Sequence, residues 1–273
     1  MFDWELLIDT TRADISACLD AWSYVLQKFL NQRIDYAYAK GSSLKPWESL
    51  IDYVPIISDV DIHIMLCDSG GLFPDSQDAF ADAMNLSQEY EDQFNKIRPE
   101  HLHIPRSQLV LIDALSEIIN YVPPRAQDVR MIIGEFTELT FPTKDTIRRI
   151  DYENLLSLSE FVNRIPNRIA DRTGFDFWSI IREMTWRVSP SPIRLLTQNA
   201  EDPLDVWSWN RTRIINELCA QGYDTIGDHY RNYYTAGWNL FLSGFTSSSY
   251  FRQTLAHGYY ILQKCFKAAE SMT

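Results

Sequence analysis

The feature that most constrains the fold is a change in hydrophobic periodicity near residue 145. Before it, short runs rich in strand-forming residues alternate with helical stretches; after it, apolar residues recur only at three- and four-residue steps. The runs that we interpret as strands are Ile34–Ala39, Val60–Leu66, Gln108–Asp113 and, as a further candidate, Val129–Phe136. The pattern predicts an α+β fold, with a mixed β-sheet domain over residues 1–144 and an all-helical bundle over residues 145–273.

Amphipathic segments surround and follow these strands. An apolar stripe runs along Thr11–Gln32, and a more polar helix is expected over Ser76–Ile97, where Arg98-Pro99 ends it. The helices of the second half are expected at Tyr152–Arg164, Phe175–Arg187, Asp205–Cys219, Ile226–Leu242 and Tyr250–Ala269.

The charge balance bears on the class of partner. The formal net charge is −12. Proteins that grip a long nucleic-acid backbone usually present a basic face that releases counterions, so this balance argues against polymeric DNA or RNA. A nucleoside triphosphate stays compatible, because bound divalent cations would mask its charge.

Other features bear on the cellular compartment. The chain begins Met1-Phe2-Asp3-Trp4-Glu5, which is acidic where a secretory signal is basic. No stretch approaches the roughly 18 uninterrupted apolar residues of a membrane span. The four cysteines are far apart and form no Cys-x-x-Cys pair, and three of them have apolar surroundings, which indicates buried reduced thiols. These features predict a soluble, cytoplasmic protein that does not enter a membrane.

Two carboxylates stand two residues apart in the run Ser58-Asp59-Val60-Asp61-Ile62. Residues two apart in a strand project from the same face, so Asp59 and Asp61 should point the same way. Adjacent carboxylates repel each other, and a divalent cation removes that cost. Hard oxygen ligands suit Mg²⁺, and metal ions held in this way promote in-line displacement at phosphorus. The pair therefore predicts a metal site for phosphoryl chemistry.

Upstream, the first expected strand is broken by Lys40-Gly41-Ser42. Glycine lets the backbone approach a phosphate closely, and successive N–H groups with a serine hydroxyl can cradle phosphate oxygens. A strand, a Gly-Ser turn, a spacer and an Asp-x-Asp strand would together place phosphate donors beside a metal site. We expect Gly41, Ser42 and Lys40 to bind a nucleotide.

These two motifs, in this order, resemble the polymerase-β-like nucleotidyltransferase superfamily, of the kanamycin nucleotidyltransferase or minimal nucleotidyltransferase type. In that family a hydrophobic strand, Gly-Gly/Ser, a spacer and Asp-hydrophobic-Asp follow one another. Ala39-Lys40-Gly41-Ser42 and Ser58-Asp59-Val60-Asp61-Ile62-His63-Ile64 stand in those places. The resemblance implies a triphosphate bound at Gly41 and Ser42, with Mg²⁺ held by Asp59 and Asp61.

The resemblance also implies a third carboxylate on a later neighbouring strand that follows a helix. By chain order, Asp113 is the first choice for this catalytic and metal-binding position, and Glu135 is the fallback. The spacer between the two motifs is longer than the family's usual one. We interpret it as an extended loop over the site, with Trp47 or Tyr53 as a candidate stacking surface.

The motifs predict an enzyme that transfers a nucleoside monophosphate from an NTP to a hydroxyl and releases pyrophosphate. Asp113 would orient or deprotonate the hydroxyl, and the helical half would shape the acceptor pocket. The acceptor could be a small molecule such as an aminoglycoside, or a protein side chain, and homodimer formation stays open. The alternative is a catalytically degenerate nucleotidyltransferase fold that serves as an interaction or antitoxin-like module.

The helical half carries a separate signal. Arg252 and His257 form an Arg-x4-His pattern on an expected helix, which resembles the HEPN helical domains, some of which are ribonucleases. General acid–base cleavage of RNA is therefore a weaker alternative.

Several polar and aromatic residues have simpler interpretations. His63 shares the expected face of Asp59 and Asp61, where we favour a polar neighbour over a ligand. His101 and His103 indicate a loop, because nothing nearby supplies the further ligands of a metal site. An aromatic cluster at helical spacings indicates core packing first and an acceptor pocket second. Its members are Trp207, Trp209, Tyr223, Tyr230, Tyr233, Tyr234 and Trp238.

Overall fold

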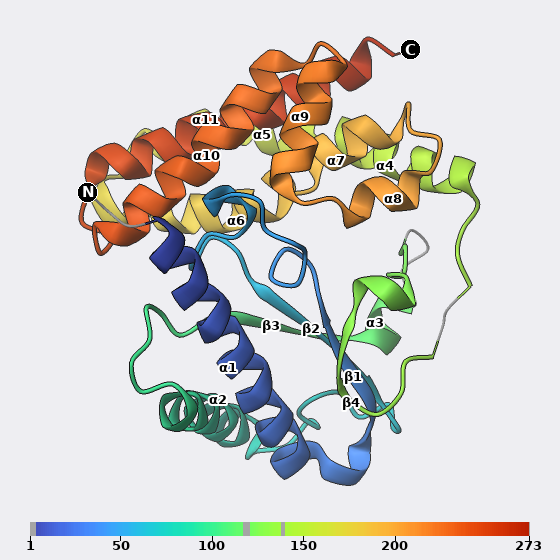
Figure 1. The fold of residues 1–273 in the computed structure, drawn as a ribbon, viewed down its shortest axis with the longest axis vertical. Coiled ribbons are helices and arrows are strands. Elements are labelled where there is room, and N and C mark those ends of the chain that lie inside the picture. The colour runs from blue at the N-terminus through green and yellow to red at the C-terminus, as the bar shows by residue number, and fades with distance from the viewer. Residues whose placement is uncertain (1–3, 117–120, 138–139, 273) are drawn as a thin grey trace. The chain divides into compact units, whose positions relative to one another are not determined.

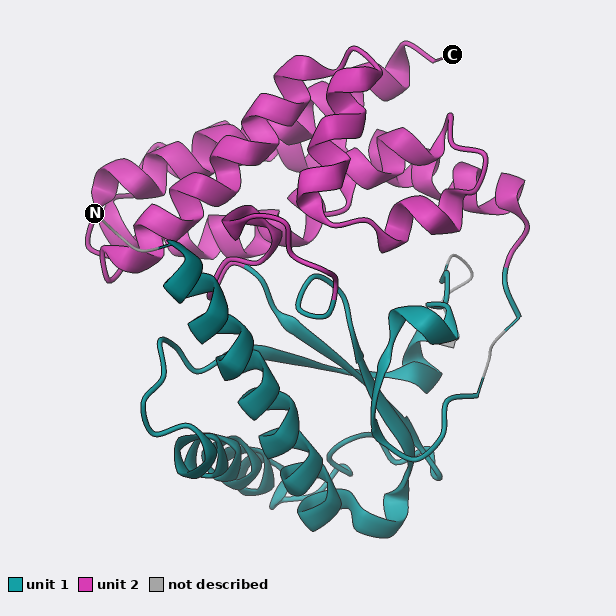
Figure 2. Cartoon of the chain, in the orientation of Figure 1, with its two compact units in different colours: residues 1–44, 58–141 teal, residues 45–57, 142–273 magenta. Residues whose placement is uncertain are grey.

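The computed structural model describes residues 4–116, 121–137 and 140–272 (Figure 1). The chain divides into two compact units, which Figure 2 colours separately. We call Met1–Leu44 with Ser58–Phe141 the sheet unit, and Lys45–Ile57 with Pro142–Thr273 the helical unit. The fold is α+β, as the sequence predicts, with a small mixed sheet and a helical region.

The sheet unit contains a four-stranded sheet with the order β3-β2-β1-β4. Its strands are β1 (Ile34–Lys40), β2 (Val60–Leu66), β3 (Ser107–Leu111) and β4 (Arg130–Ile133). β1 pairs antiparallel with β2 and β4, whereas β2 and β3 are parallel. A parallel pair needs a crossover, which α2 (Ala79–Ile97) supplies. The same unit holds α1 (Trp4–Leu30), α3 (Ile112–Ser116) and the short 3-10 helices Asn31–Arg33 and Ala126–Asp128.

One face of the sheet is covered by α1. Trp22 Nε1 on this helix donates a hydrogen bond to the Ser107 hydroxyl at 2.6 Å, and Ser107 pairs with Val60 of β2. Strand alternation therefore turns Val60, Ile62 and Ile64 toward α1, and all three are completely buried. These residues form the apolar core that the sequence alternation predicts.

The opposite face carries aromatic side chains, and we call it the aromatic face. Its buried and half-buried members are Tyr36, Tyr38, Met65, Ile112, Val129, Met131 and Phe136. Because Met65 lies on β2, the residues that share its side of the strand, Asp61 and His63, point to the aromatic face as well.

Asp14 on α1 fastens the loop that follows α2. Its carboxylate is completely buried and accepts hydrogen bonds from Leu102 N at 3.0 Å, His103 N at 3.1 Å and Arg98 Nε at 3.2 Å. His101 and His103 therefore lie in a loop, as predicted, and His103 serves as a partner of this buried carboxylate.

The element ends differ from the sequence prediction in places. α1 begins at Trp4, well before Thr11. β3 ends at Leu111, because Ile112 turns into the core as the first residue of α3. β4 ends at Ile133, just before Gly134, whose φ of +69° breaks the extended backbone.

The helical unit consists, over its described residues, of helices and loops without a strand. Its helices are α4 (Lys144–Leu156), α5 (Leu158–Ile169), α6 (Trp178–Val188), α7 (Ser191–Thr197), α8 (Pro203–Ser208), α9 (Arg211–Ala220), α10 (Asp224–Leu242) and α11 (Ser248–Glu270), with 3-10 helices at Leu50–Asp52 and Gly174–Phe177. Side chains of Thr143, Asp202, Asn210 and Ser247 cap α4, α8, α9 and α11. None of the helices in the described part of the chain is long and apolar enough to cross a membrane.

Aromatic side chains fill the core of the helical unit around α10 and α11. Tyr230, Tyr233, Tyr234 and Trp238 of α10 are almost completely buried. In α11, a Cβ on Gly258 would collide with Met184 and Tyr233, so glycine permits the close approach of these helices. Core packing, the first interpretation of the aromatic cluster, is confirmed for these four residues.

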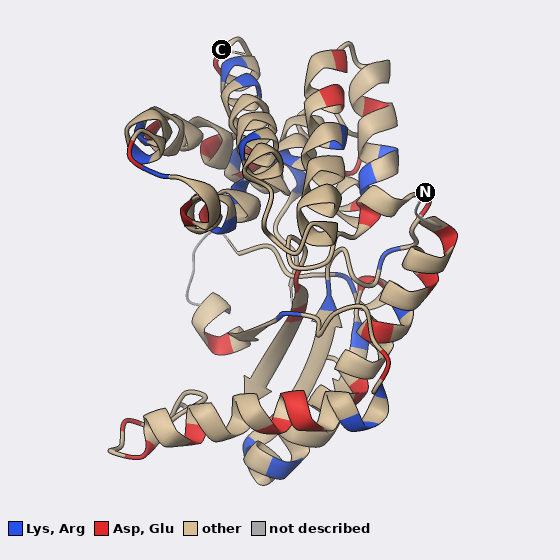
Figure 3. Cartoon of the chain, turned by 90° about the vertical axis from the view of Figure 1, so that its left-hand side faces the viewer, with Lys and Arg blue, Asp and Glu red and all other residues tan. Residues whose placement is uncertain are grey.

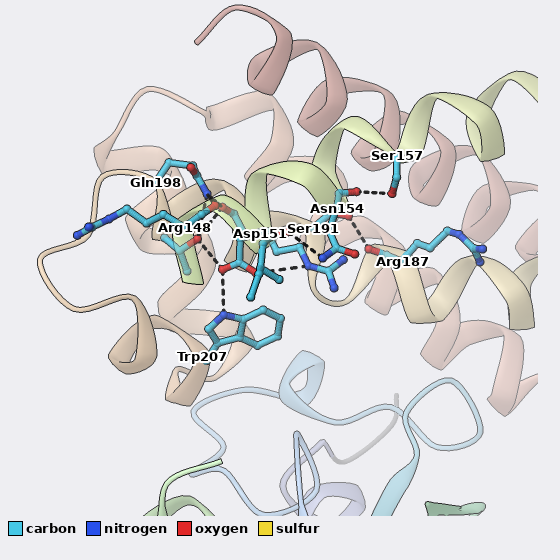
Figure 4. A network of polar contacts seen from close by, with 11 residues as sticks. Arg148, Asp151, Asn154, Ser157, Arg187, Ser191, Gln198 and Trp207 are labelled. Atoms are coloured by element: carbon cyan, nitrogen blue, oxygen red, sulfur yellow. Dashed lines mark hydrogen bonds and ion pairs between the residues drawn. The ribbon is translucent and has the colours of Figure 1, made fainter. Parts of the chain in front are cut away.

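A polar network joins α4 to α7 and α8, and Figure 4 shows the Asp151–Trp207 hydrogen bond among its contacts. The Asp151 carboxylate is buried and accepts from Thr197 Oγ1 at 2.8 Å and Trp207 Nε1 at 3.1 Å. Arg194 Nε lies 3.6 Å from it. Burial raises the pKa of Asp151, against the opposing effect of these partners. The network anchors the start of the helical unit to its middle.

The long spacer between the two sequence motifs is part of the helical unit from Lys45 to Ile57. Lys45 Nζ donates to the carbonyl oxygens of Trp207 and Trp209 at 2.7 and 2.8 Å. Trp47 and Tyr53 stack on each other, with ring centroids 5.3 Å apart. The sequence places these residues in the first domain, whereas the structure packs them against the helices of the second.

Asp52 holds the spacer in place. It is buried, and its carboxylate accepts hydrogen bonds from Ser49 N at 2.9 Å, Thr212 N at 2.8 Å and Thr212 Oγ1 at 2.9 Å. Trp238 Nε1 donates to the Leu50 carbonyl at 2.6 Å. The spacer is thus a structural element of the helical unit rather than a loose loop.

Charged residues of both signs occur along both units in the view of Figure 3. α2 carries Asp82, Glu89, Glu91 and Asp92 against Lys96. The crossover helix of the sheet unit is therefore acidic, in keeping with the net charge.

Candidate functional site

The turn after β1 lies directly against the Asp-x-Asp strand. Gly41 follows β1 with a φ of +92°, and Leu44 N donates to its carbonyl oxygen at 3.1 Å to close the turn. A Cβ added to Gly41 would lie 2.5 Å from Asp61 Oδ2, closer than real Cβ atoms come to other heavy atoms. The left-handed backbone and this close approach both favour glycine, and they show that the two halves of the sequence motif meet in space.

Asp59 and Asp61 lie at the start of β2. Asp61 pairs with Lys40 of β1 on one side and with Gln108 of β3 on the other. Asp59 immediately precedes the strand, and alternation gives it the same side as Asp61. The structure therefore brings Lys40, Gly41 and Asp61 together.

Each carboxylate has a cationic neighbour within the sheet unit. Arg106 Nε donates to Asp59 Oδ1 at 2.7 Å, and the Arg106 guanidinium forms an ion pair with Asp59 Oδ2. Burial lowers the pKa of the Lys40 ammonium, and the Asp61 carboxylate opposes that change. The like-charge cost of the Asp pair is thus relieved by Arg106 and Lys40.

His63 continues the line of Asp59 and Asp61 along β2 but is buried. Its ring stacks on Tyr38 with centroids 5.2 Å apart, and 4% of the residue is exposed. Burial, assisted by the Lys40 charge, lowers the pKa of His63 to about 3, so the ring is neutral. Its Nδ1 has no hydrogen-bond partner among the described residues.

The two candidates for the third carboxylate lie away from Asp61. Asp113 is exposed in the first turn of α3, beyond the end of β3, and its charge contributes to the raised pKa of Tyr36, for which burial is the main cause. Glu135 is exposed after β4, beyond Ile133, at the same end of the sheet. A strand rises about 3.3 Å per residue, so Leu111 at the end of β3 lies about 10 Å along the strand from Gln108, the residue paired with Asp61. Asp113 lies beyond Leu111.

Gln108 is the residue of β3 that stands beside Asp61. Ser107 faces α1, so alternation turns the Gln108 side chain to the face of Asp61. Across the described residues, no group of three or more His, Cys, Asp or Glu side chains gathers in a metal-binding arrangement. The Asp59 and Asp61 carboxylates and the Gln108 amide supply oxygen donors on this face, a set that suits a hard divalent cation.

From the sequence, Arg106 is a candidate for neutralising phosphate, with a solvated surface arginine as the favoured interpretation, and Gln108 is not identified at all. Their two-residue spacing matches that of Asp59 and Asp61, and a parallel register sets one pair against the other. No short pattern in the sequence encodes this register, so the spacing alone could not have placed Gln108 beside Asp61.

Arg252 and His257 face different parts of the helical unit. The Arg252 guanidinium lies over the Phe177 ring, 4.9 Å from its centroid, whereas His257 Nδ1 lies 3.0 Å from Nδ1 of His229 on α10. Arg252 also lines a groove of about 440 Å³ with Ile165, Phe177, Leu255 and Tyr259. The Arg-x4-His pattern therefore does not converge on one point in this structure.

Comparison with protein-family models, with curated proteins and with solved structures finds no match. The functional argument therefore depends on the residues of the site.

Proposed function

We propose that the sheet unit binds a nucleoside triphosphate with Mg²⁺ and transfers its nucleoside monophosphate to a hydroxyl, releasing pyrophosphate. The observation that carries the proposal is the contact between Gly41 and the Asp61 carboxylate. A turn that can cradle phosphate oxygens lies there against a carboxylate that can hold a cation.

The residues present fit Mg²⁺ by the chemistry of their donors. Asp59 and Asp61 supply anionic oxygens from one face, and they are the residues that would hold the ion. A bound Mg²⁺ would neutralise the triphosphate and polarise the phosphorus under attack.

The residues of the chain have separate roles in this proposal. Gly41 and Ser42 bind the β- and γ-phosphates through backbone N–H groups and the hydroxyl, and Lys40 adds positive charge beside them. The helical unit selects the acceptor, a small molecule or a protein side chain that bears a hydroxyl. Gln108 can orient that hydroxyl by a hydrogen bond but cannot take its proton, and Asp113, the base that the resemblance implies, lies away from Asp61. In this proposal the proton passes to a phosphate oxygen of the substrate itself.

A second candidate function is binding of the nucleotide without transfer. Gln108 stands beside Asp61 where a third carboxylate would complete the site, and Arg106 neutralises Asp59. A nucleotidyltransferase fold with Gln108 in place of the third carboxylate, and with Asp59 paired to Arg106, would act as a nucleotide-dependent interaction module.

Incubation with each labelled NTP and Mg²⁺ separates the two candidates. Transfer predicts pyrophosphate release together with labelling of the protein or of an added acceptor hydroxyl, and Asp61→Asn should abolish both. Asp35→Asn, an exposed carboxylate on neighbouring β1, is the matched control and should retain both. Nucleotide binding without pyrophosphate release would establish the second function, and absence of both would refute the proposal.

A further inference from the structure

We propose that Arg106 couples cation binding to triphosphate binding. In the free protein it occupies the Asp59 carboxylate; when the cation binds, it leaves Asp59 and binds the triphosphate. This inference rests on the proposed nucleotide site and adds to it a residue that belongs to neither motif.

The Asp59 carboxylate is fully engaged by Arg106. One oxygen accepts from Arg106 Nε at 2.7 Å and the other forms an ion pair with the same guanidinium, so both oxygens are used by one planar fork. The Asp59 side chain is 8% exposed. A divalent cation that approaches the Asp59 carboxylate from the side of the guanidinium must therefore displace Arg106.

Arg106 is held by its backbone, and its side chain is partly exposed although Nη2 at its tip is buried. Its carbonyl oxygen accepts from Val60 N at 3.0 Å, and the carbonyl of Pro105 accepts from the Tyr90 hydroxyl at 2.7 Å. The Arg106 side chain is 36% exposed. The guanidinium can therefore change partner while its backbone stays fixed at the start of β2.

The triphosphate offers Arg106 its new partner. Gly41 touches Asp61, two residues from Asp59, so phosphates at the Gly41 turn lie beside the carboxylate that Arg106 leaves. A guanidinium fork matches phosphate oxygens as well as it matches a carboxylate. Lys40 differs, because it is paired in register with Asp61 and its ammonium is buried.

This exchange makes the two ligands cooperative. A cation alone would break the Arg106–Asp59 pair and leave Arg106 without an anion, and a triphosphate alone would meet the Asp61 charge and find Arg106 occupied. When both ligands bind, the cation pairs with Asp59 and the triphosphate pairs with Arg106. By linkage, each ligand should raise the affinity of the other by the same factor, and we expect a factor of at least about five.

The test measures binding rather than activity. Mn²⁺ binding is followed by electron paramagnetic resonance and NTP binding by calorimetry, each with and without the other ligand, for wild type, Arg106→Ala and Arg106→Lys. Arg106→Ala should bind Mn²⁺ alone at least about fivefold more tightly and bind the NTP more weakly, and its coupling factor should fall toward one. Arg106→Lys keeps the charge but loses the planar guanidinium, so its ligand affinities and coupling factor should lie between those of wild type and Arg106→Ala.

Arg130→Ala, which replaces an exposed arginine on β4, is the control and should behave as wild type. Thermal unfolding of each variant, with and without Mn²⁺, confirms that it is folded.

Two failures are distinguishable. If the wild type binds no Mg²⁺·NTP, the proposed function fails, and the inference fails with it. If the wild type binds Mg²⁺·NTP but Arg106→Ala keeps the wild-type affinity for Mn²⁺ and the wild-type coupling, this inference alone is overturned.

Discussion

Gly41 has a φ of +92°, and its Cα faces the Asp61 carboxylate. Two constraints meet at this residue: a left-handed backbone that disfavours side chains, and a neighbour that leaves no room for a Cβ. The second constraint belongs to the candidate site, because the atom in the way is a proposed metal ligand.

Gly41→Ala should therefore impair the site beyond its cost to the backbone. We expect a loss of about 1–2 kcal/mol of folding stability from the left-handed conformation. We also expect at least a tenfold loss of Mg²⁺·NTP affinity, because Asp61 must turn away. Gly222→Ala is the control: Gly222 has a φ of +81° and nothing within 4 Å of an added Cβ, so it should lose stability only. Calorimetry measures the Mg²⁺·NTP affinity of both variants, and thermal unfolding measures their stability. Equal NTP affinities of Gly41→Ala and Gly222→Ala would contradict the role of Gly41 in the site.

The sequence predicts the placement of residues that lie close together along the chain. Gly41 follows one strand, and Asp59 and Asp61 stand two residues apart at the start of the next, so their spacing alone predicts that both carboxylates lie on one face. Arg106 and Gln108 are brought in by the parallel register of β3 with β2, which no short pattern encodes. Chain order favours Asp113, but chain order does not predict that β3 ends at Leu111, before Asp113.

At the scale of elements, β1 and β2 lie where the alternation of residues predicts them. α1 is longer than its apolar stripe indicates, and its buried carboxylate, Asp14, joins it to the loop after α2. Burial alone would raise the pKa of Asp14, but hydrogen bonds from His103 and Arg98 outweigh it and hold the pKa below its usual value.

The depressed pKa of Asp14 gives folding stability a defined pH dependence. Asp14 contributes stability above its unfolded pKa of about 3.9, and this contribution is lost as the pH falls through the lower folded pKa. Asp14→Asn should cost roughly 2–4 kcal/mol at pH 7, and the difference from wild type should shrink below about pH 4. Asp20→Asn, exposed on the same helix, should stay within about 0.5 kcal/mol of wild type. Denaturant unfolding at several pH values measures this; a pH-independent cost of Asp14→Asn would be inconsistent with it.

At the scale of the molecule, the two units are not two consecutive stretches of chain. Residues 45–57 leave the sheet unit after the Gly41 turn, pack in the helical unit, and return immediately before Asp59. The sequence could not predict this insertion, because its anchors, such as Asp52 with Thr212, are far apart along the chain. The Gly41 turn and β2 are thus both continuous with a segment that the helical unit holds.

Asp52→Ala should destabilise the helical unit selectively. Asp52 accepts hydrogen bonds from several backbone and side-chain donors, and leaving these donors unsatisfied should cost about 2–4 kcal/mol. Hydrogen exchange should accelerate in residues 45–57 and at the start of α9, with little change in α1. Asp176→Ala, exposed in the same unit, is the control. If hydrogen exchange accelerated equally in both units, Asp52 would not be a local anchor of residues 45–57.

Equilibrium binding of the four NTPs tests the central claim most directly, namely that Gly41, Asp59 and Asp61 form a cation-dependent nucleotide site. Calorimetric titrations are made with Mg²⁺ and with a chelator, for wild type and Asp61→Asn. The account predicts that the wild type binds at least one NTP only when Mg²⁺ is present, and that Asp61→Asn loses at least tenfold in affinity while it keeps the wild-type melting temperature within a few degrees. Wild-type protein that binds none of the four, or Asp61→Asn that binds as the wild type does, would contradict it.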